Sequence, residues 1–280
     1  MKILMIGATG KFAGLVLPQL KKQGLDVTAL VQDGDKGKQA LEKGADEFVI
    51  GDLYAPITLK NAAAGIDGVF HIIPAFNREV EAGLNMVKAA QEAGVSKFVF
   101  SSVYHTSLSL ANHAEKRPTE EALYHSGIDY TILQPAMYMQ MLQQSWQAAK
   151  QSGEIVMPYS KDSKMAYVDY RDVAEAAALA MTDKRLSYGT FELASPGMFS
   201  RVDLAELMSK KLGKMIVAND VPVDEWAKRV QIPPGELREG LITMNKEYDR
   251  YGFSGGNSLV LDTILGHPAR TVPQFIDELK

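Results

Sequence analysis

Glycines interrupt the first apolar run of the chain, in the stretch MKILMIGATGKFAG at residues 1–14. A glycine allows a tight turn and lets another group come close to the backbone, because it has no side chain. Between a buried strand and a helix, Gly7 would make the turn and Gly10 would admit a pyrophosphate. Ala13, with Gly14 beside it, is small enough for the helix to lie against the sheet. The helix N-terminus would then offer N–H groups and a positive dipole end to the phosphates, so this spacing predicts a dinucleotide site.

The residues after the second predicted strand bear on which dinucleotide binds. NAD-binding proteins hold the ribose hydroxyls with an acidic side chain about 20 residues after the glycines. This chain has Val31 and Gln32 there. A carboxylate would repel a 2′-phosphate, so its absence favours NADP(H), with NAD(H) still possible. Lys36 and Lys38 either supply compensating charge or only solvate the start of the next helix.

Asp52 follows the third predicted strand. It is placed to accept a hydrogen bond from the adenine amino group of a dinucleotide. Capping of the helix that follows is the alternative role of such an aspartate.

Short apolar runs alternate with amphipathic helical stretches from the first residue to about residue 135. Glycine follows each of five helical stretches, where a helix end favours left-handed backbone. Strands buried on both faces and right-handed crossovers predict a doubly wound parallel sheet, a Rossmann α/β fold. The predicted strands are 2–7, 26–31, 47–52, 68–73, 97–102 and 130–135, and the helices are 11–23, 35–43, 56–64, 77–93 and 117–126.

The pattern changes after residue 135. A long helix over 137–150 is expected first, and strands near 154–157 and 166–168, a helix over 171–182 and a strand over 189–194 follow. We therefore predict an NAD(P)-binding domain over 1–135 and a smaller α/β substrate-binding lobe over 136–280, with some exchange of chain between the two.

The composition limits the classes of function. The 280 residues carry a net charge of -4 and contain no cysteine. A nucleic-acid partner is not expected without a basic surplus, and neither a disulfide framework nor a metal site is predicted. The apolar runs are strand-length and the N-terminus lacks an export leader, so we expect a cytoplasmic protein without a membrane span.

Several motifs in order resemble one family. GATGKFAG, the aspartate of IGDL, the serines at 101–102, Lys116 and SGIDYTILQPAMY are similar to the NmrA-like branch of the atypical short-chain dehydrogenases/reductases. The resemblance continues through VDYRDVAEAAALAM and a C-terminal half like that of the quinone reductases of this branch. It implies a Rossmann domain with a small C-terminal substrate lobe. Members include quinone, azo and dye reductases, and regulators that bind NAD(P) without evident turnover.

The resemblance also implies the cofactor contacts, residue by residue. Gln32 stands where the family has an arginine for the 2′-phosphate, Gln134 where relatives often have arginine, and Met141 where they have asparagine. The implied contacts, with Lys36 added for charge, are Gly7, Ala8, Thr9, Gly10, Lys11, Phe12, Gln32, Asp52, Leu53, Pro74, Ala75, Phe76, Ser101, Lys116, Pro135, Ala136, Met137 and Tyr138.

The proton relay of typical short-chain dehydrogenases is incomplete here. Its serine position falls on Val103 and its tyrosine position, four before Lys116, on Asn112. Carbonyl reduction and nucleotide-sugar epimerisation would lack their acid. Water, or one of the side chains Tyr104, His105, His113 and Tyr138, could supply a proton instead. A solvated helix start is the alternative for His113, and His105 is similar.

These observations predict an NAD(P)H-dependent reductase of quinone-like, azo or other electron-poor aromatic acceptors. Lys116, bridging a ribose hydroxyl, and Tyr138, beside the nicotinamide, are the predicted catalytic residues, although Tyr138 could serve only as a packing platform. The methionines at 137, 139 and 141 are core filler or an adaptable surface for flat substrates. The alternative is an NAD(P)-binding redox sensor without turnover, and the chain is expected to be a monomer or a homodimer.

Overall fold

The computed structural model describes residues 1–73 and 78–280. The chain divides into two compact units, one of Met1–Pro135 with Tyr170–Glu192 and one of Ala136–Asp169 with Leu193–Lys280. Residues 170–192 thus belong to the first unit. The predicted boundary at 135 assigned them to the second lobe, although some exchange of chain between the two was expected. Three predicted cofactor contacts, Pro74, Ala75 and Phe76, lie outside the described residues.

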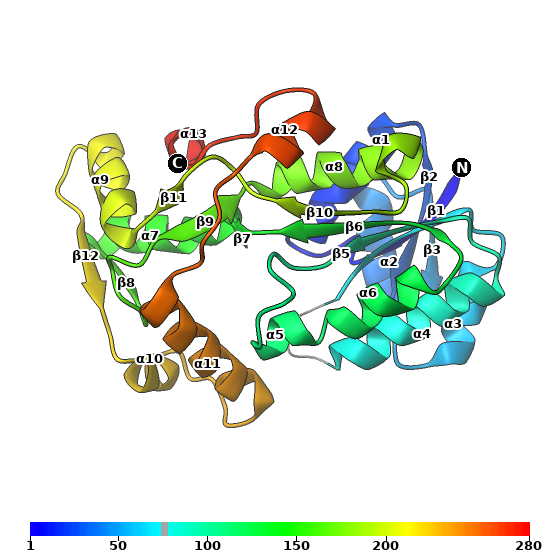
Figure 1. The fold of residues 1–280 in the computed structure, drawn as a ribbon, viewed down its shortest axis with the longest axis horizontal. Coiled ribbons are helices and arrows are strands. Elements are labelled where there is room, and N and C mark those ends of the chain that lie inside the picture. The colour runs from blue at the N-terminus through cyan, green and yellow to red at the C-terminus, as the bar shows by residue number, and fades with distance from the viewer. Residues whose placement is uncertain (74–77) are drawn as a thin grey trace. The chain divides into compact units, whose positions relative to one another are not determined.

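One sheet of seven strands forms the centre of the first unit (Figure 1). Its strands are β1 (Lys2–Ile6), β2 (Asp26–Val31), β3 (Glu47–Ile50), β4 (Gly68–Ile72), β5 (Lys97–Ser101), β6 (Asp129–Pro135) and β10 (Gly189–Leu193). They lie in the order β10-β6-β5-β4-β1-β2-β3, and the neighbours from β3 to β6 are parallel. The direction of winding reverses between β1 and β4, where open α/β sheets bind ligands at the carboxyl ends of the strands. The predicted doubly wound Rossmann fold is therefore confirmed.

Helices cover both faces of this sheet (Figure 1). They are α1 (Val16–Lys22), α2 (Gly34–Glu42), α3 (Pro56–Ala63), α4 (Glu79–Glu92), α5 (Ala111–Ala114), α6 (Arg117–Tyr124) and α8 (Tyr170–Thr182), with short 3-10 turns η1 (Ala13–Leu15) and η3 (Lys184–Leu186). Helix α1 packs on α8, and α4 packs on both α3 and α6.

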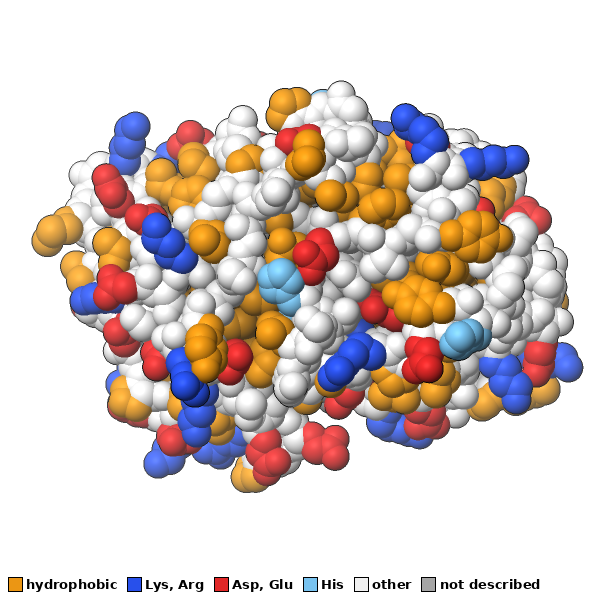
Figure 2. Space-filling model, in the orientation of Figure 1, with side chains coloured by type: hydrophobic (Ala, Val, Ile, Leu, Met, Phe, Trp, Pro, Cys, Tyr) orange, Lys and Arg blue, Asp and Glu red, His pale blue; other side chains and the backbone are white. Residues whose placement is uncertain are grey.

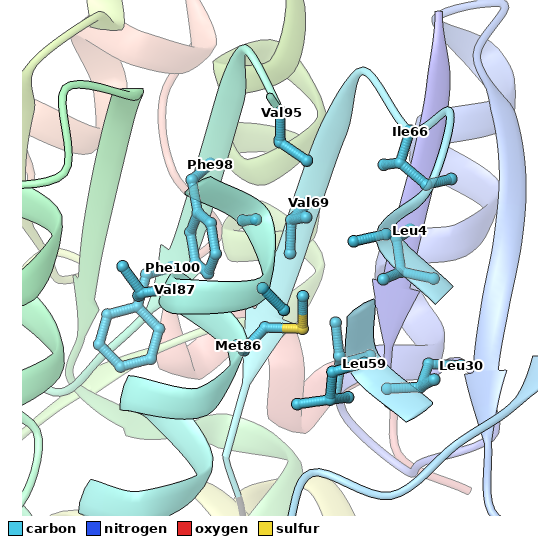
Figure 3. Packing of buried hydrophobic residues seen from close by; sticks show 14 of the residues in the cluster. Leu4, Leu30, Leu59, Ile66, Val69, Met86, Val87, Val95, Phe98 and Phe100 are labelled. Atoms are coloured by element: carbon cyan, nitrogen blue, oxygen red, sulfur yellow. The ribbon is translucent and has the colours of Figure 1, made fainter. Parts of the chain in front are cut away.

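The main apolar core fills the space between the sheet and the α3–α4–α6 layer (Figure 3). Leu4, Val69 and Phe98 project from the strands toward Leu59 and Met86 on the helices, and all five are fully buried. Burial of such side chains stabilises a fold by about 1.5–3 kcal/mol each. This core fixes the strand ends from which the candidate site residues extend.

Two predicted helices begin later than expected. The helix predicted over 11–23 starts at Val16, after the η1 turn. Pro18 is the physical reason, because proline has no N–H and is tolerated in the first turn of a helix rather than in its interior. The helix predicted over 137–150 starts at Leu142, because Met137 and Tyr138 pair as a strand with Tyr167 and Val168.

The second unit contains two small sheets, in the orders β11-β9-β7 and β12-β8. Its elements are β7 (Met137–Tyr138), η2 (Met139–Met141), α7 (Leu142–Ser152), β8 (Glu154–Met157), β9 (Met165–Val168), β11 (Met198–Phe199), α9 (Arg201–Leu212), β12 (Val217–Asp220), α10 (Val223–Arg229), α11 (Glu236–Tyr251), α12 (Leu259–Leu265) and α13 (Val272–Glu278). None of the helices in the described ranges has the length and apolar character needed to cross a bilayer. Figure 2 shows basic and acidic side chains interspersed over the face in view.

A histidine lies inside the apolar layers of the first unit. His71, on β4, has no exposed surface, and neither ring nitrogen has a hydrogen-bond partner within the part of the chain that the structure describes. Its ring stacks on Phe100 and meets Phe98 edge-on, with ring centroids 5.7 and 5.9 Å apart. Burial, and to a smaller extent the Lys116 cation, lowers the pKa of His71 to about 3.

This residue predicts a loss of stability in acid. Below about pH 6.5 the unfolded chain protonates His71 while the folded chain does not, so stability falls as the pH drops toward 3. Between pH 8 and pH 5 the loss from this residue should be about 2 kcal/mol. The variant His71→Phe should lose that contribution when urea unfolding is measured at both pH values. The exposed His125→Gln should keep it, and equal pH dependence of His71→Phe and the unmodified chain would contradict the assignment.

Candidate functional site

The glycine loop at residues 7–12 leaves the carboxyl end of β1 at the switch point. Gly7 has a φ of +81°, a left-handed conformation that favours glycine, and a Cβ there would lie 2.9 Å from Ala13 Cβ. Its carbonyl accepts the N–H of Gly10 at 2.8 Å. The small Ala13 thus lets η1 close on the turn, as the spacing predicted.

The loop has the donors that a pyrophosphate needs. No acceptor in the described residues receives the N–H groups of Thr9 and Lys11. Gly10 and Lys11 are exposed, and a Cβ at Gly10 would occupy space 3.1 Å from the Gly7 carbonyl oxygen. The loop therefore fits the phosphates of a dinucleotide, with Ala8 buried beneath it.

Lysines rather than an arginine stand near the loop and the end of β2. Gln32 and Lys36 are both exposed, and the Lys36 N–H is capped by Asp33 Oδ1 at 2.8 Å. Lys43, which the sequence interpretation did not single out, donates from Nζ to the Thr9 carbonyl at 2.8 Å. Lys43 therefore places an ammonium group at the loop. Lys36 and Lys43 are both candidates for contact with a 2′-phosphate.

Asp52 lies in a turn after β3. Its Oδ1 accepts the N–H of Tyr54 at 3.0 Å, while its own N–H donates to Thr58 Oγ1. Asp52 stays exposed, so the carboxylate shapes its own turn rather than capping α3 directly. Leu53 packs against the core, and its carbonyl accepts from Asn85. Contact of this turn with adenine stays a prediction.

Lys116 lies between α5 and α6 and forms a buried ion pair that the sequence did not reveal. Its Nζ pairs with the Glu79 carboxylate at the start of α4 and donates to the Ile73 carbonyl at 3.2 Å. The two side chains are 6% and 0% exposed. The ammonium is thus held at a fixed place next to the end of β4, and its contact with a ribose hydroxyl stays a prediction.

The two serines at the end of β5 contact different partners. Ser101 Oγ lies 3.5 Å from the buried Tyr170 hydroxyl, whose ring faces Phe12 at a centroid distance of 5.8 Å. Burial raises the pKa of Tyr170 to about 12, so this phenol stays neutral. Ser101 therefore anchors α8 beneath the glycine loop, and its contact with the cofactor stays a prediction.

A second buried carboxylate, that of Glu120, lies next to the end of β5. Ser102 Oγ and Gln134 Nε2 donate to Glu120 Oε1 at 2.6 and 2.9 Å. Both of these donors to Glu120 are neutral side chains. The pairing connects β5, β6 and α6.

The remaining predicted residues divide between the two units. Pro135 ends β6 in the first unit, whereas Ala136, Met137 and Tyr138 belong to the second. The role of Tyr138 beside a nicotinamide therefore stays a prediction. Met139 is fully buried and Met141 is 44% exposed, so the methionines do not share one environment.

Two histidines follow β5 and contact each other. His113 is buried, so a solvated helix start is wrong for it, and its Nδ1 lies 3.1 Å from the His105 carbonyl. His105 is partly exposed and pairs with Glu192. Val103 and Asn112 occupy the relay positions without a hydroxyl. The potential proton donors near Lys116 in this unit are therefore the histidines and Tyr104.

Comparison with known proteins identifies the family of the chain. The NmrA-like family profile matches residues 1–277. An NAD(P)H azoreductase of Xenophilus azovorans is 28% identical over 284 residues, which span 98% of this chain and 96% of the relative. The NADPH-dependent quinone oxidoreductase of Escherichia coli, solved with NADPH, matches 98% of both chains with 25% identity and a TM-score of 0.85.

A triphenylmethane reductase of Citrobacter sp., solved with NADP(H), has a TM-score of 0.87 over 100% of both chains at 24% identity, which shows the shared fold. The profile match extends over nearly the whole chain, and the glycine loop lies at the switch point of the sheet. The chain belongs to the NmrA-like family.

Proposed function

We propose that this chain is a reductase that transfers hydride from NADPH to an electron-poor aromatic acceptor, such as a quinone or an azo compound. NAD(P)H-dependent oxidoreductase activity is the class of its relatives, and bound NADPH would supply the hydride. The observation that carries the proposal is the loop Gly7–Phe12 at the switch point, where Gly10 and Lys11 are exposed, with Lys116 fixed beside the neighbouring strand end.

The choice of acceptor rests on the relay positions. A simple aldehyde becomes a localised alkoxide when it takes up hydride, and it needs a well-placed acid in the transition state. Val103 and Asn112 provide no hydroxyl at the positions where the relay of typical short-chain dehydrogenases would have one. A quinone delocalises the negative charge over its ring and makes less demand on the protein. Without these two hydroxyls any proton must come from another group, and this supports acceptors that delocalise the added charge over aldehydes and sugars.

Stopped-flow oxidation of bound NADPH against a panel of acceptors tests this proposal. We expect a quinone to react faster than a simple aldehyde by about two orders of magnitude, which is the low end of what a placed general acid contributes. Equal rates would contradict the assignment of acceptor class. Tight NADPH binding with no turnover of any acceptor would instead favour the redox sensor.

A further inference from the structure

His105 has a backbone conformation that is uncommon for residues other than glycine. It lies in the loop after β5 with a φ of +55°, in the left-handed region that glycine occupies most easily. Histidine there is held at some cost in free energy, and such residues cluster at functional sites. The conformation therefore suggests a functional role for the His105 side chain.

Three hydrogen bonds fix the backbone of His105. Its N–H donates to Glu192 Oε1 at 3.1 Å, and its carbonyl accepts from the N–H of Leu108 at 3.0 Å. The same carbonyl lies 3.1 Å from His113 Nδ1. A carbonyl can only accept, so the His113 proton is on Nδ1. The surroundings therefore hold His105 in one conformation.

Contacts with Glu192 and Tyr104 also hold the ring of His105 in one orientation. Nδ1 lies 2.8 Å from Glu192 Oε1, the same oxygen that receives the N–H of His105. The ring also lies against Tyr104, with centroids 4.0 Å apart. A carboxylate hydrogen-bonded to one imidazole nitrogen fixes the orientation of the ring and therefore the direction of the other nitrogen. The side chains of His105 and Glu192 are 27% and 42% exposed, so solvent can renew a proton.

The pair lies near the groups already assigned to the site. The loop follows the carboxyl end of β5, two residues beyond the relay position at Val103. His113, which binds the His105 carbonyl, also accepts the N–H of Lys116 at 3.1 Å. One short segment thus connects His105 with the buried ammonium that is proposed to hold the ribose.

The neighbouring candidates are less suited to give up a proton. Burial lowers the pKa of His113, so its ring is neutral and its Nδ1 proton is held by a carbonyl. Burial, together with the Glu192 charge, raises the pKa of Tyr104. His105 is the candidate with a carboxylate against its ring.

We propose that His105, oriented by Glu192, is the general acid that protonates the acceptor as it takes up hydride. This inference rests on the proposed function. For an azo acceptor, hydride adds to one nitrogen of the N=N bond and the imidazolium Nε2–H bond breaks to form N–H on the other nitrogen. The product is a hydrazo compound, and the neutral ring regains its proton from water. For a quinone, hydride from NADPH goes to one carbonyl oxygen, the Nε2 proton goes to the other, and the product is a hydroquinone.

Acceptors that differ in their need for a proton test this role. A cationic triarylmethane dye becomes neutral when it takes up hydride, so it needs no acid. An azo compound forms a basic nitrogen anion and needs one most. Single-turnover rates with these two acceptors and with a quinone are compared in the variants His105→Gly and Glu192→Gln. Glycine accepts the positive φ of position 105 without strain, so His105→Gly is expected to fold.

In His105→Gly the rate with the azo compound should fall by about a hundredfold, the low end of general-acid catalysis. The quinone rate should fall less and the cationic dye rate should stay within a factor of about three, since no proton is needed there. Imidazole added to the buffer should restore the azo rate. Affinity for NADPH, measured by fluorescence, should not change. His125→Gly, an exposed histidine after α6, is the matched control.

Glu192→Gln acts through His105. Its azo rate should also fall more than its cationic dye rate, but by a smaller factor than in His105→Gly. The ¹H–¹⁵N NMR signal of the His105 Nδ1–H, shifted by the carboxylate in the unmodified chain, should move in this variant. Equal losses with azo compound and cationic dye would overturn the role of His105 and leave the proposed function standing. Failure of the unmodified chain to reduce any of the three acceptors would overturn the proposed function and this inference together.

Discussion

Replacing Lys116 by methionine should lower the free energy of unfolding by about 3–5 kcal/mol. Glu79 has no exposed surface, and the Lys116 ammonium forms an ion pair with its carboxylate. Removal of the lysine leaves a carboxylate charge in the interior, which costs more than the loss of one ion pair at the surface. Urea unfolding of the variant and of the unmodified chain at neutral pH gives the difference.

Two further variants separate stability from function at this pair. Lys88→Met removes an exposed lysine on α4 that lies 4.0 Å from Glu92, and it should change stability by less than about 1 kcal/mol. The double variant Lys116→Met with Glu79→Leu should recover most of the lost stability, because an apolar pair replaces a buried ion pair. Its affinity for NADPH should stay low, since Lys116 is proposed to bind the ribose. If Lys116→Met is no less stable than Lys88→Met, the buried pair does not persist in solution.

The fold could be predicted from the sequence because each of its signals is local. Apolar runs of strand length, amphipathic stretches and turn glycines each depend on neighbouring residues, and their repetition gave the doubly wound sheet. Five glycines predicted at helix ends all have positive φ: Gly24, Gly44, Gly65, Gly94 and Gly127. The errors came where tertiary pairing decides, as at Met137 and Tyr138, which pair with β9 instead of beginning a helix.

The family, the oxidoreductase class and the NADP(H) cofactor were also predicted, through motifs that lie close together in the chain. The ion-pair and hydrogen-bond partners of the candidate site residues were not predicted from the sequence. Glu79 meets Lys116 across 37 residues, counted from their positions, and Glu192 meets His105 across 87. Such pairs have no periodic pattern, because they form only when separate strand ends meet at one edge of the sheet.

Local rules of structure are broken at the places that the sequence left unexplained. His105 has a backbone conformation better suited to glycine, and the carboxylates of Glu79 and Glu120 are buried. A sequence interpreted by propensity alone assigns these residues to exposed surface. Natural proteins keep such exceptions mainly where a site needs them, which is why the same positions carry our proposals.

Gly10→Val should weaken NADPH binding by about a thousandfold, or roughly 4 kcal/mol, while the fold survives. The φ of Gly10 is not in the left-handed region, so valine causes no strain of that kind, and its Cβ would lie 3.1 Å from the Gly7 carbonyl oxygen. The branched methyl groups would then cover the N–H groups of Thr9 and Lys11, which the pyrophosphate requires. Calorimetry with NADPH measures the loss, with Ala64→Val at an exposed helix end as control for the added bulk. Unchanged affinity in a folded Gly10→Val would show that the phosphates bind elsewhere.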